Sequence, residues 1–535
     1  MTAGKLTRPS RLSLEAMFPY LLVGILALAL ALRLIALDKS LWLDEWASVR
    51  GILGGNFRYV LHAMRDEHPP FYFLLLKAWS QAGTSETVLR LPSVAFGVLT
   101  VLVVAVWLRR YTALGALLAS LYLAVSPALL RNSQEVRQYA LLGLLTALSF
   151  AFASCLSAAP QKRWPYLGLG CSLCIAMLTH LVGVFLIGSV AVFAALMTVD
   201  RKRLRPVEAI LTFAAPGVLF LLTTLFYLDR SGVLRNTQWM PHVNLDLVAA
   251  VARDVFGFAD DLWSPGAAPS SPIDLAYGVG LTALVFLAAL VVFGRWRTSY
   301  PFLAAALAYW LGIVVCSLAA RPILLSKTVL PGLIPFVGFV AVQIGTVRPR
   351  GIKAGLALIV AALAVVLGLR WATYTAWAPV EDWKLAASRI DSKWQPGDLI
   401  VAYPAYAAGP VKYYMHNAGS QAVIGVNPGT PAEQLERQIG QTPASTGGVA
   451  AAPALFLILR ADSTAQTDPG TFRELLALLK RRSGSPYELR SALIGSTDAA
   501  IEKDLLAGLA AEFGPPLSFE NSGSLAWVSY RGEPK

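Results

Sequence analysis

The chain has few charged residues and few cysteines for its length. Only 14% of its 535 residues are charged, whereas 56% are hydrophobic, and a soluble protein needs more polar surface than this. The four cysteines all lie within apolar runs: Cys155, Cys171, Cys174 and Cys316. Neither a disulfide framework nor a soluble zinc site is therefore indicated. The composition predicts a polytopic membrane protein.

Several motifs of nucleotide-binding enzymes are also missing. The sequence contains no Asp-x-Asp, no P-loop and no G-x-G-x-x-G followed by an acid at dinucleotide spacing, which argues against a nucleotide-sugar enzyme of the soluble type. The net charge is +13, but no basic run is longer than the RKRLR loop at 201–205, so nucleic-acid binding is not indicated. Basic loops on one side of a membrane account for the charge.

Apolar stretches of about 20 residues, the length that crosses a bilayer, occur throughout the first 375 residues. They predict eleven transmembrane helices near 18–38, 87–108, 112–130, 138–157, 164–180, 181–199, 207–228, 273–294, 300–319, 324–345 and 351–372. We therefore expect residues 1–375 to form an α-helical transmembrane domain.

The composition changes after this point. Residues 376–535 contain short apolar runs (LIVAY, AVIGV, ALFLILR, LAWVSY) that alternate with helical patterns such as TFRELLALLKRR. Runs rich in β-branched and aromatic residues predict strands. The expected fold is a polytopic α-helical membrane protein with a C-terminal α/β domain over 376–535.

Lysine and arginine in the short loops predict the orientation. The segment before the first span is basic, and so are the loops after the even-numbered spans; such loops usually face the cytoplasm. Eleven crossings then place the C-terminal domain outside. Among the acids of the membrane half, only Glu15, Asp200 and Glu208 fall on the cytoplasmic side. Chemistry that uses acids is therefore expected at the outer face.

The first outer loop gathers acids and a histidine. Asp44 and Glu45 lie in LWLDEWASV, which is typical of an interfacial helix anchored by its Leu and Trp residues, and Glu67 and His68 lie in RDEHPPFYFLLLK. The Pro-Pro pair sets His68 at the start of an apolar helix. A histidine there can bind a phosphate or a metal, move a proton or cap the helix. These four residues could hold a divalent metal ion or none; no other cofactor is indicated.

The motifs resemble a known family. The D-E pair after the first span, HPPFYFLLLKAW, SETVLRLPSVAFGVLT and SQEVRQYALL are similar to the bacterial protein-mannosyltransferase-like branch of the GT-C glycosyltransferases. That superfamily includes the aminoarabinose transferases of lipid A and the galacturonosyltransferases of lipopolysaccharide core. The resemblance covers residues 40–200 and is weaker at ILLSKTVLPGLIPF.

The resemblance implies an enzyme of the bacterial cytoplasmic membrane. Such an enzyme moves a sugar from a polyprenyl-phosphate donor to an acceptor at the outer face, which is a glycolipid, lipopolysaccharide or a protein. The family's catalytic acid falls on Asp44, with Glu45 beside it. The H-P-P element falls on His68, and R-Q-Y-A falls on Arg137 and Tyr139, close to Glu135.

A late helix departs from the family pattern. Relatives usually open this helix with an arginine-tyrosine pair, whereas this chain has Ser326 and Lys327. A lysine neutralises a phosphate as a point charge, without the bidentate fork of arginine. The donor-phosphate assignment to Lys327 is therefore an expectation from charge alone.

The chemistry of glycosyl transfer calls for the same residue types. The attacking group needs a base, and the phosphate leaving group needs cations. Asp44 can supply the first, and Arg131, Arg137 and Lys327 can supply the second, with His180 at a helix end as a further candidate. The arginines can also extend to lipid headgroups. Glu67, Glu135 and Tyr139 complete the expected substrate site.

Two other classes remain open. One is a transporter or flippase of a lipid-linked saccharide, which usually has repeats and charges near the membrane midplane; the other is a catalytically silent assembly partner. Here the charges gather at one face and no repeat is seen. Because the acids and motifs lie in the membrane half, we expect that half to assemble the site by itself, and the C-terminal domain to tune acceptor choice or stability.

Overall fold

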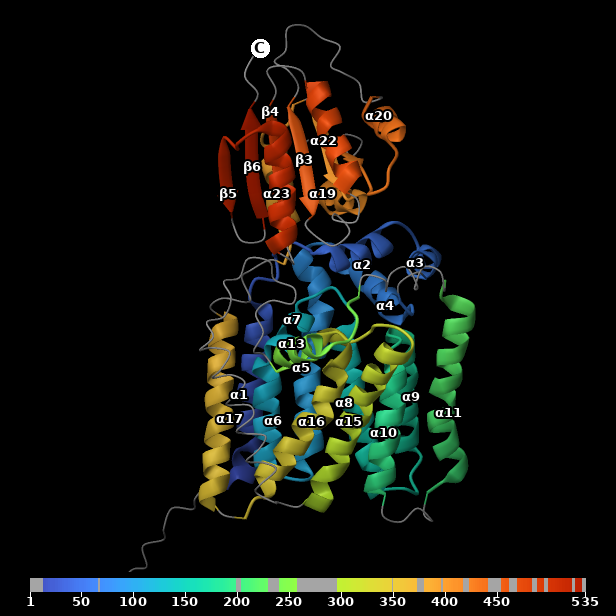
Figure 1. Cartoon of the computed structure of the whole chain (residues 1–535). Helices are drawn as coiled ribbons and strands as arrows, with labels where there is room; N and C mark the ends of the chain where they lie inside the picture. Colours follow the sequence, from blue (N-terminus) through green and yellow to red (C-terminus); the bar gives the residue numbers. More distant parts are fainter. Residues whose placement is uncertain are drawn as a thin grey trace, which may run out of the picture.

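The structure, a computed structural model, consists of a helical bundle with an α/β domain at one end (Figure 1). It describes residues 13–65, 68–198, 204–229, 240–256, 296–348, 350–372, 380–395, 398–416, 423–440, 454–460, 469–483, 488–494, 499–521 and 525–531. The expected domain boundary at 375/376 lies outside these residues.

Within the described ranges, seven single helices are long and apolar enough to cross a membrane. They are α1 (Leu14–Leu34), α5 (Glu86–Arg109), α8 (Tyr139–Ala158), α11 (Pro206–Leu222, continued by a π-helical turn to Tyr227), α15 (Trp296–Ala319), α16 (Ser326–Thr346) and α17 (Arg350–Arg370). At 1.5 Å per residue, 20 residues span about 30 Å.

Shorter or bent helices account for three more of the expected spans. The helices α6 (Ala113–Val125) and α7 (Pro127–Ser133) form one bent span, and α9 (Trp164–Thr179) and α10 (Gly183–Met197) are shorter apolar helices. The remaining expected span, 273–294, lies outside the described residues. The helical membrane fold expected from the sequence is confirmed.

The bend between α6 and α7 delivers polar residues to the site. The two helices meet at 59°, and Pro127 is the first residue of α7. Proline has no backbone N–H and cannot continue the hydrogen bonding of α6, but it suits the first position of a new helix. The buried Asn132 and Ser133 of α7 and the loop into α8 consequently lie near the end of the bundle that faces the α/β domain (Figure 1).

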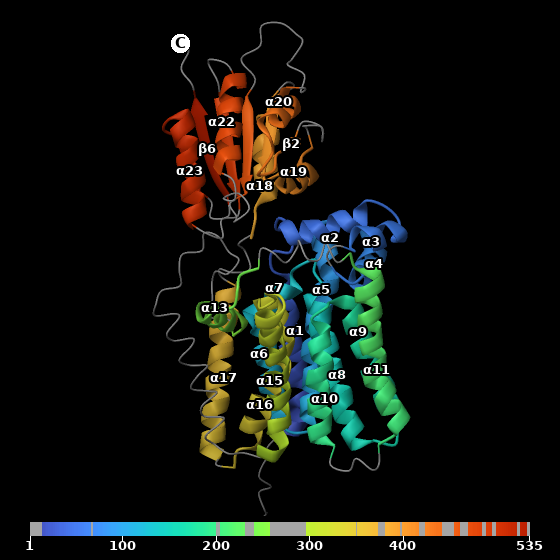
Figure 2. The same ribbon diagram turned by 45° about the vertical axis from the view of Figure 1, so that its right-hand side comes forward.

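Three short helices lie across this same end (Figure 2): α2 (Leu43–Leu53), α3 (Phe57–Ala63) and α4 (Phe71–Trp79). The sequence predicts that Leu41 and Trp42 anchor this segment in the lipid interface, but they are only 1% and 5% exposed. The Nζ atom of Lys327 lies 3.9 Å from the centre of the Trp42 ring. These apolar side chains therefore pack inside the protein.

The α/β domain contains a six-stranded sheet in the order β2-β1-β3-β4-β6-β5. Its strands are β1 (Leu399–Tyr403), β2 (Val423–Gly425), β3 (Leu455–Arg460), β4 (Glu488–Ile494), β5 (Ser518–Asn521) and β6 (Leu525–Arg531). The pairs from β2 to β4 are parallel, and β6 is antiparallel to both β4 and β5. The four apolar runs that predict strands form β1, β2, β3 and β6, while the sequence gives no clear signal for β4 and β5.

Helices cover both faces of the sheet. Alternate residues of β1 face opposite sides: Val401 packs in one core and Ile400 in the other. The first core includes residues of α20 (Ala432–Gly440), α22 (Pro469–Ser483) and α23 (Ala499–Phe513), and the second includes residues of α18 (Trp383–Asp391) and α19 (Ala408–Tyr414). The helices α18 and α19 follow the membrane helices in the chain and contact the end of the bundle.

Candidate active site

Asp44 lies between two cations that come from distant parts of the chain. It is in the first turn of α2, Arg137 precedes α8, and Lys327 is the second residue of α16. The Oδ2 atom of Asp44 is 3.8 Å from Nη2 of Arg137 and 3.8 Å from Nζ of Lys327. The Asp44 side chain is 36% exposed, whereas those of Arg137 and Lys327 are 5% and 9% exposed. The arrangement is an accessible carboxylate backed by two buried positive charges.

Glu45 has a different environment from its neighbour. Its Oε2 atom is 2.6 Å from Nη2 of Arg90, its Oε1 atom accepts a hydrogen bond from Nε of Arg90 at 2.9 Å, and both side chains are 1% exposed. The Glu45 carboxylate also accepts hydrogen bonds from the backbone N–H groups of Val136 and Trp42. It thus connects α2, α5 and the loop before α8. The structure gives Glu45 a connecting position instead of the open one expected of a catalytic group.

Arg90 holds the chain that leads into α2. Besides its bonds to Glu45, its guanidinium donates to the carbonyl oxygens of Leu37, Lys39 and Ser40 at 2.7 to 3.1 Å. A buried arginine needs such partners because an unpaired charge is costly in an apolar interior. The Arg90–Glu45 pair therefore fixes both the approach to α2 and the start of that helix, on which Asp44 lies.

Lys327 is held by three neighbours, of which the sequence placed Glu135 and Tyr139 in the site but not Trp42. Its Nζ atom is 3.3 Å from Oε2 of Glu135, and it lies over the rings of Trp42 and Tyr139, 3.9 and 5.4 Å from their centres. Burial raises the pKa of Glu135, and Glu45 and Asp44 act in the same direction, while Lys327 opposes the shift. Glu135 and Tyr139 thus both contact the Lys327 ammonium group.

His68 supports Arg137. Its Nε2 atom is 3.0 Å from Nη2 of Arg137, and because a guanidinium only donates, Nε2 accepts and the ring proton is on Nδ1. Burial lowers the pKa of His68 well below its usual range, and His180, Arg137 and Lys327 add to the effect. His68 is therefore neutral at physiological pH. It orients Arg137 and does not itself add positive charge to the site.

His180 packs beside His68. The centres of the two rings are 4.9 Å apart, and the His180 ring is 5.4 Å from that of Tyr139. The Nδ1 atom of His180 accepts a hydrogen bond from the backbone N–H of Val182 at 3.1 Å. The junction between α9 and α10 is thereby joined to the site.

One expected site residue, Arg131, lies outside this cluster. Arg131 forms an ion pair of 3.3 Å with the buried Asp254, which lies on α13 (Leu245–Val255). Glu67 lies outside the described residues. Arg131 is therefore occupied at the side of the site where α13 crosses the bundle.

Two of the four candidate metal ligands, Glu45 and His68, are bound to other groups. In the part of the chain that the structure describes, no three or more His, Cys, Asp or Glu side chains come together as a metal site. The Glu45 carboxylate is occupied by Arg90 and backbone N–H groups, and His68 Nε2 is occupied by Arg137. Two of the four candidate ligands therefore point their lone pairs at other partners, and a third, Glu67, is not described.

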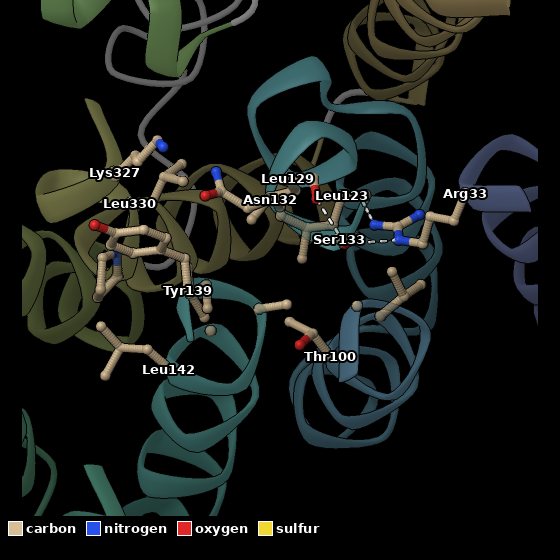
Figure 3. Close-up of a pocket in the computed structure, with 16 residues that line it drawn as sticks. Arg33, Thr100, Leu123, Leu129, Asn132, Ser133, Tyr139, Leu142, Lys327 and Leu330 are labelled. Atoms are coloured by element: carbon tan, nitrogen blue, oxygen red, sulfur yellow. Dashed lines mark hydrogen bonds between the residues drawn. The ribbon is translucent and has the colours of Figure 1, made fainter. Parts of the chain in front are cut away.

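A narrow cavity extends behind Lys327 (Figure 3). Its lining includes Lys327, Tyr139, Asn132 and Arg33, which come from α16, α8, α7 and α1. The buried Arg33 donates to Oγ of Ser133 at 3.1 Å and to backbone carbonyl oxygens. Among the described residues, the buried Oδ1 atom of Asn132 has no hydrogen-bond partner. The cavity thus presents a polar acceptor on the inner side of Lys327.

The sequence interpretation missed Arg33, Arg90 and Glu381. The first two had a signal, because each arginine interrupts an apolar run, in LALALRLIAL and SETVLRLPSV, and a charge inside a transmembrane segment usually has a function or a partner. Glu381, which binds the start of α2, had no such signal. It is distant in sequence and reaches the site only through the packing of the α/β domain.

Residues 67–231 match the sequence family described as dolichyl-phosphate-mannose-protein mannosyltransferase. No curated protein sequence matches the chain. The family match covers about a third of the chain and agrees with the resemblance to the mannosyltransferase-like GT-C glycosyltransferases that the motifs indicated. The fold is that of a multi-pass membrane protein of the GT-C type.

Similar solved structures include ArnT from Cupriavidus metallidurans. The crystal structure of its apo state has a TM-score of 0.55 and 14% sequence identity, and the match covers 97% of this chain and 98% of that one. The structure of the same protein bound to undecaprenyl phosphate has a TM-score of 0.54 and 15% identity, and it covers 95% and 97% of the two chains. The helical bundle and the α/β domain are therefore shared over nearly the whole length.

Proposed function

We propose that the protein transfers a sugar from a polyprenyl-phosphate donor to an acceptor at the outer face of the bacterial cytoplasmic membrane, with Asp44 as the general base. The matching family is described by a dolichyl-phosphate sugar donor, and ArnT, which shares the fold, binds undecaprenyl phosphate. The observation that carries the proposal is the accessible Asp44 carboxylate, 3.8 Å from each of the buried cations Arg137 and Lys327.

The position of Asp44 suits proton removal from the acceptor. An acceptor hydroxyl or amine that attacks the anomeric carbon must lose a proton, and a carboxylate within reach can accept it. Asp44 is on the open side of the cluster, whereas Glu45 and Glu135 are buried and bound to Arg90 and Lys327. Of these three carboxylates, Asp44 is the one that a substrate can approach from solvent.

The two cations suit the leaving group. As the bond from the anomeric carbon to the phosphate oxygen breaks, negative charge grows on the phosphate, and fixed cations in a partly buried site stabilise it. Arg137 presents its guanidinium with His68 and the Asp44 backbone oxygen as supports. Lys327 adds a point charge steadied by Glu135 and the Trp42 ring. No step in this mechanism requires a metal ion.

The distribution of basic loops supports an outer location of the site. At the end of the bundle away from the α/β domain, Arg109 pairs with Glu15 at the start of α1, and Arg205 pairs with Glu208 at the start of α11. Basic residues at that end favour a cytoplasmic location for it. The site and the α/β domain are then extracytoplasmic.

The placement of buried charges also favours an enzyme over a transporter. Arg33 is in the last turn of α1, Arg90 is near the start of α5, and Lys327 is at the start of α16. These charges meet at one end of the bundle, whereas a transporter of a charged lipid is expected to place charges near the midplane. The arrangement suits chemistry on a head group that stays at one membrane face.

Asp44→Asn tests the proposal directly. The variant keeps the size of the side chain and removes its basicity, so turnover should fall about 10²- to 10⁴-fold while donor binding persists. In the assay, purified protein is incubated with membrane glycolipids as acceptors and with synthetic polyprenyl-phosphate mannose or another polyprenyl-phosphate sugar as donor. Mass spectrometry detects the product. Donor binding is measured in parallel.

Asp38→Asn is the matched control, because Asp38 lies in the segment that leads into α2 and its side chain is exposed. It should keep near wild-type turnover. Near-normal turnover of Asp44→Asn would contradict the assignment and direct the search for the base to Glu135 or Glu67. Absence of transfer by the wild-type protein from every polyprenyl-phosphate sugar would contradict the proposed donor class.

A further inference from the structure

The start of α2, which carries Asp44, is bound by a side chain of the α/β domain. The backbone N–H of Leu43, the residue before Asp44, donates a 2.7 Å hydrogen bond to Oε2 of Glu381. The first N–H groups of a helix have no partner within that helix, and a carboxylate there also interacts favourably with the helix dipole. Glu381 therefore caps α2 from a different domain.

Glu381 is itself fixed within the α/β domain. Its side chain is 3% exposed, and its Oε1 atom accepts a 2.8 Å hydrogen bond from Nε of Arg460 at the end of β3. The indole N–H of Trp383 donates to Oε2 at 2.8 Å, and Arg460 also donates to the Tyr406 hydroxyl at 3.1 Å. A buried carboxylate with these partners has little freedom, so its position follows that of the sheet.

Further contacts from α18 and α19 hold the same segment. The Tyr414 hydroxyl accepts a 2.9 Å hydrogen bond from the backbone N–H of Leu41, and Lys384 donates to the carbonyl oxygen of Asp38 at 3.1 Å. The ring of Trp46, two residues after Asp44 on α2, is 5.2 Å from that of Tyr413. The α/β domain thus contacts the chain on both sides of Asp44.

From these contacts we infer that Glu381 is a positioning residue for the reaction: it acts through Leu43 to hold Asp44 between Arg137 and Lys327. The inference rests on the proposed function of Asp44. It changes the expected division of labour, because the membrane half alone lacks the carboxylate that accepts the Leu43 N–H. Small displacements of a reacting group cost up to about 100-fold in rate, which makes one carboxylate sufficient to influence turnover.

The test compares Glu381→Ala and Glu381→Gln in the full-length protein. Glu381→Ala removes the cap, and kcat should fall about 10- to 100-fold with the KM for the polyprenyl-phosphate donor within about twofold of wild type. Glu381→Gln keeps an amide oxygen that can accept from Leu43 N–H but loses the ion pair with Arg460, so it should recover part of the loss. Glu520→Gln is the matched control, because Glu520 pairs with Arg389 within the α/β domain and does not contact α2.

A second measurement does not depend on catalysis. Hydrogen–deuterium exchange of peptides covering 41–46 should become about tenfold faster in Glu381→Ala, while it should stay unchanged in Glu520→Gln. Tyr414→Phe, which removes the acceptor for Leu41 N–H, should accelerate exchange at the start of the same peptide. Thermal unfolding of each variant shows whether the fold is retained.

The two measurements separate the inference from the proposed function. If wild-type protein transfers no sugar, the proposed function fails, and the exchange data still decide whether Glu381 holds α2. Unchanged exchange at 41–46 in folded Glu381→Ala would overturn the inference. The inference would also be overturned if kcat fell equally in Glu381→Ala and Glu381→Gln while exchange stayed unchanged. The hydrogen bond from Leu43 to residue 381 would then have no influence on Asp44.

Discussion

The ion pairs at the two ends of the helical bundle differ in how far their side chains are buried. At the end that meets the α/β domain, Arg90 and Glu45 form a 2.6 Å ion pair with both side chains 1% exposed. At the other end, Arg109 and Glu15 form a 3.3 Å pair with 47% and 63% exposure. Exposed pairs contribute little to stability, whereas burial of a pair costs desolvation that only good geometry offsets.

The difference indicates at which end of the bundle the positions of the charged side chains are important. Solvent screens the charges at the exposed end, and their positions can vary without consequence. At the site end, by contrast, Glu45 and Arg90 are buried and joined by hydrogen bonds to the loop before α2 and the loop before α8. Four experiments, from the largest expected effect to the smallest, test whether this contrast reflects function.

Breaking the buried pair should have the largest effect. Glu45→Gln leaves the Arg90 guanidinium buried without its counter-charge, so the free energy of unfolding should fall by about 3–5 kcal/mol. Turnover should also fall, because the pair holds the start of α2. Thermal unfolding in detergent and the transfer assay measure the two effects. A loss of turnover equal to that of Asp44→Asn in a fully stable Glu45→Gln protein would instead indicate that Glu45 takes part in the chemistry.

Lys327→Ala should weaken donor binding as well as turnover. The donor phosphate is negatively charged in both the ground and the transition state, and hydrogen bonds to charged groups contribute about 1.5–3 kcal/mol. The Kd of a polyprenyl-phosphate donor should therefore rise about 10- to 100-fold. Lys327→Arg should retain most of the binding, and the exposed Lys162 at the far end gives the control Lys162→Ala. An unchanged Kd in Lys327→Ala would remove this lysine from the phosphate site.

His68 should make stability depend on acid pH. Its pKa is lowered in the folded state, while the unfolded chain takes up a proton below about pH 6.5. Its contribution to stability is therefore complete above about pH 6.5 and is lost as the pH falls below that value, by at most about 1.4 kcal/mol per pH unit. The Tm of His68→Gln should vary less between pH 5 and 6.5 than that of wild type. Identical pH profiles would show that His68 is not kept neutral by the fold; exposed His62 provides the comparison His62→Gln.

The exposed pair should matter least. Glu15→Gln makes the same chemical change as Glu45→Gln, but its partner Arg109 stays hydrated, so we expect a change of about 0–1 kcal/mol in the free energy of unfolding and unchanged turnover. The same unfolding and transfer measurements apply. If Glu15→Gln proved as damaging as Glu45→Gln, burial would not be what distinguishes the two ends.

The sequence alone determined the class of fold and named several of the residues that the structure brings together around Asp44. Hydrophobic length identifies membrane helices because the bilayer fixes that length, and every expected span within the described residues coincides with a helix or a bent pair. The motifs named Asp44 and Glu135, and charge alone named Lys327; the structure brings the three together. These features can be predicted from the sequence because the residues that indicate each one lie within a single short segment of the chain.

Tertiary structure decided how these residues divide their roles. Asp44 and Glu45 are adjacent in sequence and chemically similar, yet one is accessible and the other is buried against Arg90. Nothing local distinguishes them, because the difference comes from α5 and from the loop before α8. Glu381 is the extreme case: it lies far along the chain, and only the docking of the α/β domain on the bundle brings its carboxylate to Leu43. Side chains separated by hundreds of residues meet only when the whole chain has folded.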